Sequence, residues 1–561
     1  MDKIIIYQLL PRLFGNSTEN CVAGGTIQQN GCGKFNDITK EALCAIRGLG
    51  ATHVWYTGII EHTTKTSYET YGIPCDHPAI VKGEAGSPYA IKDYYDTDPD
   101  LAVDVKNRRE EFKELIARTH ETGLKVIMDF IPNHVARHYH SDNTPAGTYS
   151  FGEFDDKEVF FAGHNNFYYL GNQQYGCNLD AKEGADEEYC EAPLRATGND
   201  CFGSPSRNDW YDTVKLNYGI DYRTGNRQFS PVPNTWVKML KILQYWASQG
   251  IDGFRCDMVE MTPVEFWNWA VPKIKEQFPG IIFIGEIYQP HIYRSFINDG
   301  GFDYLYDKVG LYDTLRAVMN GQCSANEISN TLQSTADIRN NMLTFLENHD
   351  EQRIASDFFA ANAERALAAF IVSTTIDSQP FMLYAGQELG ERGMDKEGYS
   401  GVDGRTTIFD YWSVETLRRW KGDGSYSGEM LTEEEKSLQA FYAHILNLCN
   451  NNEALREGTY YGLQYANQHS ADYDSNHIYS YLRGTDKELI LIVTNFSDSD
   501  KECKVTIPEE AFAYFSAECN SKNQKAVELI SGKTMELPFN PLDKISVTVP
   551  ANNGVILKFE L

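Results

Sequence analysis

The chain has 561 residues, with 42% hydrophobic and 23% charged side chains, and its formal net charge is 50 − 79 = −29 at pH 7. This composition excludes a disordered chain, a collagen repeat and a short disulfide scaffold. The length allows roughly two to four domains, or one large barrel with additions. The excess of negative charge disfavours nucleic acid and anionic membranes as partners and favours a neutral substrate.

Short apolar runs typical of strands alternate with longer amphipathic stretches over most of the chain. Taken in chain order, the expected strands are residues 3–9, 53–60, 125–131, 251–256, 281–285, 302–306, 342–346 and 380–384. The clearest helices between them are residues 39–49, 106–122, 234–249 and 263–278. Continuous apolar strands are typical of parallel sheets that are buried on both faces. Eight strand–helix units therefore predict an α/β fold, a (β/α)₈ TIM barrel.

Two regions depart from this alternation. Residues 135–213 are rich in Gly, Asn, Asp and aromatic side chains without a helical period, and structureless loops of this length are rare. From about residue 460 the apolar pattern has period two, which predicts antiparallel strands. We therefore expect a barrel of residues 1–134 and 214–455, an inserted small domain of residues 135–213 after the third strand, and a C-terminal β-sandwich of residues 456–561.

The chain carries no sign of export or of membrane insertion. No run approaches the ~18 apolar residues of a membrane helix, and the first residues show no signal-peptide pattern. The twelve cysteines include no CxxC pair, so we expect free thiols. Cys177, Cys190 and Cys201 are the one group that suggests a disulfide or a metal, but their spacing matches no zinc motif. These features favour a cytoplasmic protein.

Three carboxylates follow predicted barrel strands, at the end where the active site of this architecture forms. Asp257 ends the fourth strand, Glu286 the fifth and Asp350 the seventh. Each alone is more simply explained as a helix cap, but a pair of carboxyl groups is the minimum machinery for cleaving a glycosidic bond. Arg255 shares a strand face with Asp257, and we expect its charge to keep Asp257 ionised. The group as a whole predicts a glycosidase.

A series of segments in the expected order resembles the motifs of the α-amylase family of glycoside hydrolases (glycoside hydrolase family 13). They are SPYAIKDYYDTDPDL (87–101), DFIPNH (129–134), VKLN (214–217), GFRCD (253–257), FIGE (283–286), ENHD (347–350), PFMLYAGQELG (380–390) and GRTTIFDYW (404–412). The VKLN segment is nearest to the form found in neopullulanases and cyclomaltodextrinases. The resemblance covers the barrel and leaves the subfamily open.

The resemblance implies a role for each of the three carboxylates. Asp257 would be the nucleophile, Glu286 the general acid/base, and Asp350 the stabiliser of the transition state, in a retaining mechanism with a covalent glycosyl-enzyme. It also implies a set of substrate-binding residues around the distorted sugar, with a tyrosine stacked beneath it. These residues are Tyr89, which is the stacking tyrosine, and His134, Arg255 and His349.

The calcium site of the family is only partly represented. Asn133 matches the calcium-binding asparagine, but Lys215 stands where the family often has an aspartate ligand. Glu260 and Met261 replace the Lys-His pair that many α-amylases carry. We therefore expect that no cofactor is required, with calcium at Asn133 as the alternative.

The leading interpretation is a retaining hydrolase of α-1,4-glucosidic bonds, with some action on α-1,6 bonds, in maltooligosaccharides or related α-glucans. One alternative is a transglycosylase on the same scaffold, in which a sugar hydroxyl rather than water attacks the intermediate. A second alternative is a catalytically inactive α-glucan-binding relative, which the presence of all three carboxylates disfavours. The sequence does not predict an oligomeric state.

Overall fold

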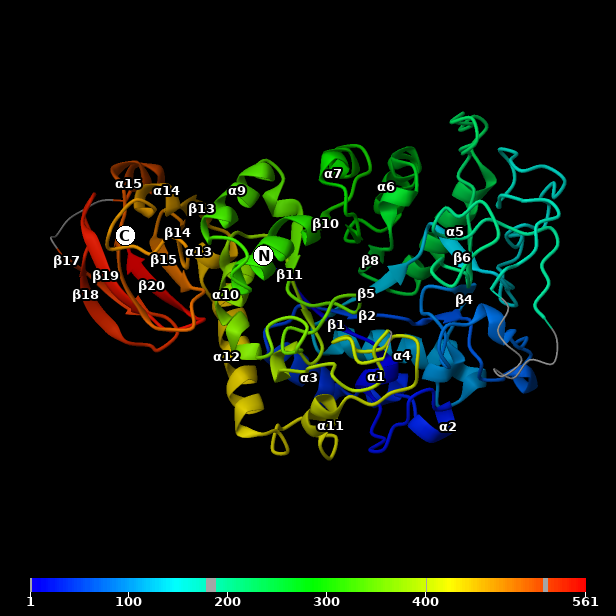
Figure 1. Ribbon diagram of the computed structural model, residues 1–561, viewed down its shortest axis with the longest axis horizontal. Helices are drawn as coiled ribbons and strands as arrows, with labels where there is room; N and C mark the ends of the chain where they lie inside the picture. Colours follow the sequence, from blue (N-terminus) through cyan, green and yellow to red (C-terminus); the bar gives the residue numbers. More distant parts are fainter. Residues whose placement is uncertain (1–2, 178–187, 400, 518–522) are drawn as a thin grey trace.

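The computed structural model describes residues 3–177, 188–399, 401–517 and 523–561. Its central feature is a closed parallel barrel with the strand order β1-β12-β11-β10-β9-β8-β5-β2 (Figure 1). The barrel strands are β1 (Ile5–Leu9), β2 (His53–Tyr56), β5 (Lys125–Phe130), β8 (Gly253–Cys256), β9 (Ile282–Gly285), β10 (Tyr304–Tyr306), β11 (Met342–Phe345) and β12 (Phe381–Tyr384). These eight strands confirm the predicted (β/α)₈ barrel. Every residue of β1, β2, β8, β11 and β12 is buried, which explains why most of their residues are apolar.

Helices surround the barrel, and the four that the sequence predicted most clearly are present. The helices are α1 (Pro11–Phe14), α2 (Ile27–Asn30), α3 (Lys40–Gly48), α4 (Arg108–Glu121), α5 (Asn234–Ser248), α6 (Val264–Gln277), α7 (Tyr293–Asn298), α8 (Asp313–Met319), α9 (Asn326–Ser334), α10 (Leu367–Thr375), α11 (Glu415–Lys421), α12 (Glu433–Asn451), α13 (Glu453–Arg456), α14 (Gln464–Asn467) and α15 (Glu509–Phe515). Their boundaries follow local signals. The Thr39 side chain caps α3 by accepting the N–H of Ala42, and Gly123 and Gly250, just beyond α4 and α5, adopt the positive φ that favours glycine.

The inserted region lies at one end of the molecule and begins and ends in a short antiparallel pair (Figure 1). This pair is β6 (His134–Ala136) with β7 (Thr213–Lys215). The described residues between the two strands form no helix. They pack around a small core that includes Leu170, Tyr175 and Leu194 and is shared with Ala79 and Ile80 from the segment between β3 and β4. A second pair, β3 (Ile60–His62) with β4 (Ile91–Thr97), lies beside the same end.

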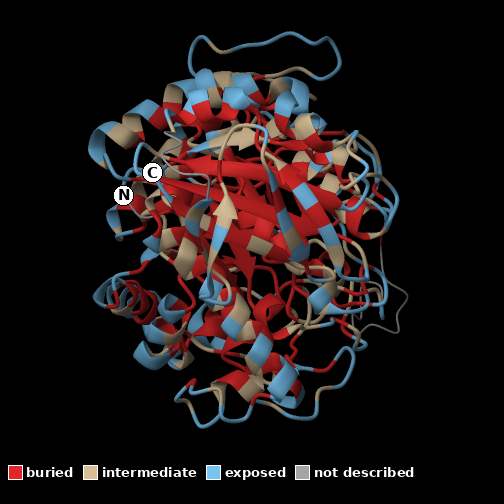
Figure 2. Cartoon of the chain, turned by 90° about the vertical axis from the view of Figure 1, so that its left-hand side faces the viewer, coloured by how far each residue is buried: buried red, intermediate tan, exposed pale blue. Residues whose placement is uncertain are grey.

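The C-terminal domain lies at the opposite end and consists of antiparallel strands (Figure 1). Its strands are β13 (Thr459–Gly462), β14 (Ile478–Gly484), β15 (Glu488–Asn495), β16 (Lys501–Thr506), β17 (Asn523–Glu528), β18 (Thr534–Pro538), β19 (Lys544–Val549) and β20 (Gly554–Glu560). A six-stranded sheet of order β13-β14-β15-β20-β17-β18 accompanies the pair β16-β19. Figure 2, viewed from this end, colours the residues by burial: β14 and β15 are buried throughout, whereas β16 to β19 include exposed residues.

The large C-terminal sheet contributes to two different cores. Along β15, Leu489, Leu491 and Val493 point into the core of the C-terminal domain, whereas Ile490 and Ile492 join the core of the barrel. Because side chains alternate between the faces of a strand, this division accounts for the period-two pattern of the sequence. The barrel-facing side of the sheet packs on the buried helix α10.

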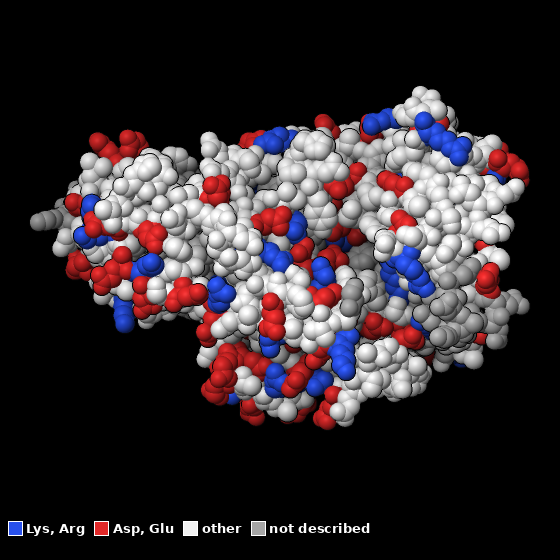
Figure 3. Space-filling model, viewed as in Figure 1, with Lys and Arg blue, Asp and Glu red and all other residues white. Residues whose placement is uncertain are grey.

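Within the described residues, no helix combines the length and the apolar character needed to cross a bilayer. The described cysteines are all free thiols, including Cys177, Cys190 and Cys201, so the expectation of free thiols is met for these residues. Cys519 lies outside the described residues. On the face shown in Figure 3, acidic and basic side chains are interspersed.

Candidate active site

A cavity of about 440 Å³ opens at the carboxyl ends of the barrel strands. Asp257 follows β8, Glu286 follows β9 and Asp350 follows β11, and all three line this cavity together with Tyr89 and His134. The parallel strands bring these side chains together because their carboxyl ends all face the same side of the barrel. Five of the predicted site residues therefore share one cavity, and the other two lie directly behind it.

Arg255 on β8 holds the first two carboxylates. Its Nη1 lies 2.8 Å from Asp257 Oδ1, and its Nη2 lies 2.8 Å from Glu286 Oε2. The guanidinium is buried, with an exposed fraction of 1%, and lies over the rings of Trp55 and Tyr89 at 5.2 and 5.6 Å. A planar cation fixed in this way can pair with two acids at once, so it sets the position of both.

Arg255 is not the only influence on the pKa of Asp257. Burial and the neighbouring Glu286 carboxylate raise the pKa of Asp257 well above its usual range, and the Arg255 charge offsets only part of this rise. The Arg255 charge therefore acts in the expected direction without setting the net shift, and the same guanidinium also lies 3.4 Å from Asp129 Oδ1.

Glu286 is further held by two donors. The backbone N–H of Met258 donates to Oε2 at 2.9 Å, and the Tyr288 hydroxyl donates to Oε1 at 2.6 Å. Met258 adopts a positive φ of 43°, which is uncommon for a residue other than glycine. The turn after β8 is thus shaped so that its amide meets the carboxylate at the end of β9.

Asp350 is kept ionised by its own neighbours. His349 Nε2 lies 3.0 Å from Asp350 Oδ2, and His349 Nδ1 lies 2.7 Å from Gln8 Nε2. Although burial acts to raise it, the charge and hydrogen bond of His349, together with Arg255, lower the pKa of Asp350 to about 2. The carboxylate remains about 35% exposed and can therefore accept hydrogen bonds from a bound molecule.

Tyr89 lies against His349 at the cavity wall. Its hydroxyl is 2.5 Å from His349 Nε2, and the two rings are 5.3 Å apart with an interplanar angle of 19°. Tyr89 precedes β4, and its ring is half-buried, so the aromatic surface is presented to the cavity rather than to the barrel core. The predicted stacking on a sugar remains a prediction.

His134 is a neutral member of the site. Burial, together with the positive charges of Lys82 and Lys215, lowers the pKa of His134 to about 3. Asn133 Nδ2 lies 3.3 Å from His134 Nδ1, which assigns Nδ1 as the acceptor and leaves the proton on Nε2. The imidazole also lies beside Trp210, with 5.2 Å between the ring centroids.

The family's calcium position does not fit a calcium ion in this chain. The Lys215 ammonium lies 2.7 Å from Asn133 Oδ1 and 2.6 Å from Asp200 Oδ1, and the Met261 carbonyl is 3.5 Å away. The oxygen of Asn133 that would bind a cation is therefore already bonded to a buried cationic side chain. A divalent ion beside this ammonium would meet like-charge repulsion.

The structure adds cavity residues that the sequence analysis missed. Tyr288, Tyr399, Trp210, Lys82 and Phe409 all line the cavity. Tyr288 could have been found, because it lies two residues after Glu286 and so shares its side of the chain. The other four come from loops whose approach to the barrel depends on tertiary structure.

Comparisons with known proteins identify the family of this chain. The family described as "Alpha amylase, catalytic domain" matches residues 8–407. The chain belongs to the α-amylase family. Among its relatives, an α-amylase of Streptomyces lividans is 24% identical over 567 residues, covering 92% of this chain and 55% of the relative. A cyclomaltodextrinase of a Bacillus species is 22% identical over 519 residues, covering 88% of this chain and 72% of the relative.

Solved structures of the α-amylase family share the fold of the whole chain. A maltogenic α-amylase from Thermotoga neapolitana superposes with a TM-score of 0.62 at 19% identity, covering 100% of this chain and 99% of that one. An α-amylase from Geobacillus thermoleovorans, complexed with acarbose, gives 0.62 at 17% identity, covering 100% and 98%. The chain thus spans about half the length of the Streptomyces relative but nearly all of these two solved structures.

Proposed function

We propose that this member of the α-amylase family is a retaining glycoside hydrolase that cleaves α-1,4-glucosidic bonds, and some α-1,6 bonds, in maltooligosaccharides or related α-glucans. The observation that carries the proposal is the bridge formed by Arg255, whose guanidinium lies 2.8 Å from both Asp257 and Glu286. One guanidinium can hold two carboxyl groups only when they are close together. Retaining enzymes need carboxyl groups about 5–5.5 Å apart.

In the proposed first step, an Asp257 oxygen attacks the anomeric carbon while Glu286 gives its proton to the glycosidic oxygen. The glycosidic bond breaks, the shortened glucan leaves with that proton, and a glycosyl ester forms on Asp257. In the second step Glu286 takes a proton from water, and the resulting hydroxide displaces Asp257 from the anomeric carbon.

The surrounding side chains support the binding of a sugar. Asp350, with its pKa lowered to about 2, stays ionised and can accept sugar hydroxyl protons while opposing the positive charge of the transition state. Neutral His134 can donate from Nε2. Tyr89, Trp210 and Phe409 present aromatic faces to the cavity, and such faces pack on the apolar face of a pyranose ring.

The substrate and setting are proposed on the same basis. A cyclomaltodextrinase is among the relatives, and one similar structure is complexed with acarbose, which favours an α-glucan over other glycosides. The free thiols of the described residues favour a reducing compartment, in keeping with a cytoplasmic location. The Lys215 ammonium beside Asn133 favours activity without calcium at that position.

A time course of products tests this function. Maltoheptaose, pullulan and soluble starch are each incubated with the protein and with its Asp257→Asn variant, and the products are separated by chain length. Shorter maltooligosaccharides or glucose, absent with the variant, are the expected result. Products longer than maltoheptaose would instead favour the transglycosylase, and no turnover of any substrate would contradict the proposal.

A further inference from the structure

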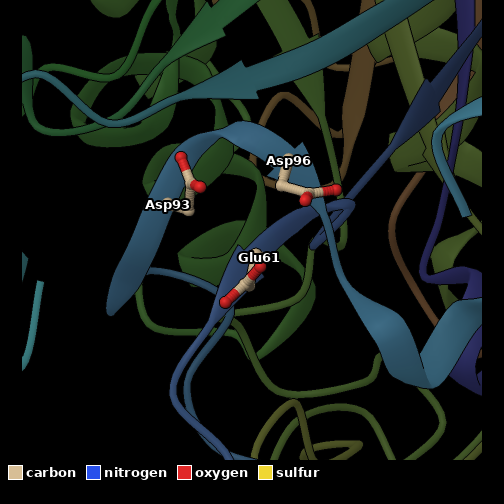
Figure 4. Close-up of side chains that lie close together, drawn as sticks. All are labelled: Glu61, Asp93 and Asp96. Atoms are coloured by element: carbon tan, nitrogen blue, oxygen red, sulfur yellow. The ribbon is translucent and has the colours of Figure 1, made fainter. Parts of the chain in front are cut away.

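Three carboxylates outside the active site meet between β3 and β4. Glu61 comes from β3, and Asp93 and Asp96 come from β4 (Figure 4). Their exposed fractions are 4%, 1% and 0%. One oxygen from each side chain lies within 4.8 Å of the others. The register of the two strands shifts on both sides of Glu61 and sets it directly opposite Asp93.

This arrangement is unfavourable unless something neutralises it. Like charges directly opposite each other in a strand pair destabilise the pair, and burial strengthens their repulsion. Arg108 supplies one partner, with its Nη2 2.6 Å from Asp96 Oδ2, while Arg109 Nε lies 4.0 Å from Asp96 Oδ1. Lys92 on the same strand is directed elsewhere, to Asp76 at 3.0 Å.

Asp93 and Asp96 are well supplied with donors, but Glu61 is not. Asp93 accepts the hydroxyl of Ser141 at 2.6 Å and the N–H of Asp142 at 3.0 Å, and Asn143 donates to Asp96. Within the described part of the chain, no hydrogen bond or ion pair reaches the Glu61 carboxylate, although it is more than nine-tenths buried.

A second buried polar group without a hydrogen-bond partner lies on the same strand as two of the acids. The Tyr95 hydroxyl, on β4 between Asp93 and Asp96, is buried without a hydrogen-bond partner. Glu61 contributes a buried carboxylate that no donor of the described residues satisfies, beside the two other acids.

We propose that Glu61, Asp93 and Asp96 bind an oxygen-preferring divalent cation, calcium or magnesium. Carboxylate oxygens are the ligands that both ions prefer, and oxygens on one calcium ion at about 2.4 Å lie no more than about 4.8 Å apart. The cation would join the β3–β4 pair to the start of the inserted domain, through Ser141 and its neighbours on Asp93. The site shares no residue with the Asn133 position and does not depend on the proposed function.

Titration of the metal-free protein tests the proposal. The whole chain is treated with a chelator, desalted and titrated by calorimetry with CaCl₂ and, separately, MgCl₂. We expect one saturable site per chain for at least one of the two salts, and a higher melting temperature in its presence. Absence of saturable binding up to about 1 mM, the weak end of protein calcium sites, would overturn the proposal and leave a proton as the neutralising charge.

Two variants locate the site. Glu61→Gln keeps the shape of the side chain and is expected to fold, but to bind the cation at least tenfold more weakly. Glu110→Gln makes the same substitution at an exposed position on α4, 66% exposed in its side chain, and is expected to bind as the wild type does. Equal binding by the wild type and Glu61→Gln would refute the assignment.

A measurement on the wild type covers the case in which Glu61→Gln does not fold. Amide hydrogen exchange is compared with and without the cation that binds. The proposal requires added protection in β3, β4 and residues 141–143. Protection confined to other segments would overturn it.

Discussion

Removal of the Tyr288 hydroxyl should change the pH range over which the enzyme works. This hydroxyl donates to Glu286 Oε1 at 2.6 Å, and burial together with the Glu286 and Asp350 charges raises the pKa of Tyr288, so the tyrosine stays a donor. A donor to a carboxylate favours its ionised form, whereas the proposed first step needs Glu286 protonated. Because Tyr288→Phe removes a donor that favours the ionised acid, we expect the alkaline limb of kcat/KM to move upward in this variant.

The size of this shift follows from the geometry. A hydrogen bond to a charged acceptor contributes about 1.5–3 kcal/mol, which corresponds to roughly 1–2 pH units. Tyr288 is half-buried at the cavity wall, so water can reach the vacated position and replace part of the bond. We therefore expect the lower end of the range, a shift of about one pH unit.

The assay is kcat/KM on maltoheptaose across the pH range for the wild type, Tyr288→Phe and a matched control. Tyr399→Phe removes a hydroxyl from the same cavity, but that hydroxyl donates to the His349 carbonyl and to Asp350 at 3.4 Å instead of to Glu286. Its alkaline limb should stay in place. An unmoved limb in Tyr288→Phe, or the same shift in both variants, would refute the reasoning.

Three further predictions concern the other charged groups of the site. Asp257→Asn should lower kcat by ~10⁴-fold or more, which corresponds to about 5.5 kcal/mol of activation free energy. The melting temperature should be unchanged, because the amide keeps the shape of the side chain but cannot attack the anomeric carbon. Near-wild-type turnover would show that Asp257 is not the nucleophile. The pKa of Asp350 is lowered to about 2, so the stability that its ionised form contributes is present above the ordinary aspartate range and is lost as the pH falls toward 2. The melting temperature of Asp350→Asn should therefore fall less steeply than that of the wild type over this pH interval. Equal slopes would contradict this expectation. Lys215→Met should destabilise the protein by ~2–4 kcal/mol, because Asn133 and Asp200 lose their partner. The difference in the free energy of unfolding between Lys215→Met and the wild type, measured with denaturant, should be the same with and without calcium. If calcium abolished this difference, the ion could take the place of the ammonium.

The barrel could be predicted because its determinants are local. A strand such as β9, which is buried except for the partly exposed Ile282, is apolar throughout, and the polar residue after it lies at the barrel mouth. Asp257, Glu286 and Asp350 were found for that reason. The raised pKa of Asp257 could not be predicted in the same way, since it depends on how deeply Asp257 is buried and on the Glu286 carboxylate beside it. The meeting of Glu61 with Asp93 likewise depends on a local shift of strand register, which leaves no signature in the residues themselves.

The shared face of β14 and β15 means that the C-terminal domain is not an independent appendage. Tyr481 bonds to the Thr375 hydroxyl at the end of α10, and buried Arg483 donates to the Thr375 carbonyl at 2.8 Å. Ile490 and Ile492 complete the apolar surface on which that helix rests. A chain that ended at residue 455 would expose one apolar face of α10 to solvent and would be prone to aggregate. The barrel and the C-terminal sheet should therefore melt as a single cooperative unit, although their sequences follow different hydrophobic patterns.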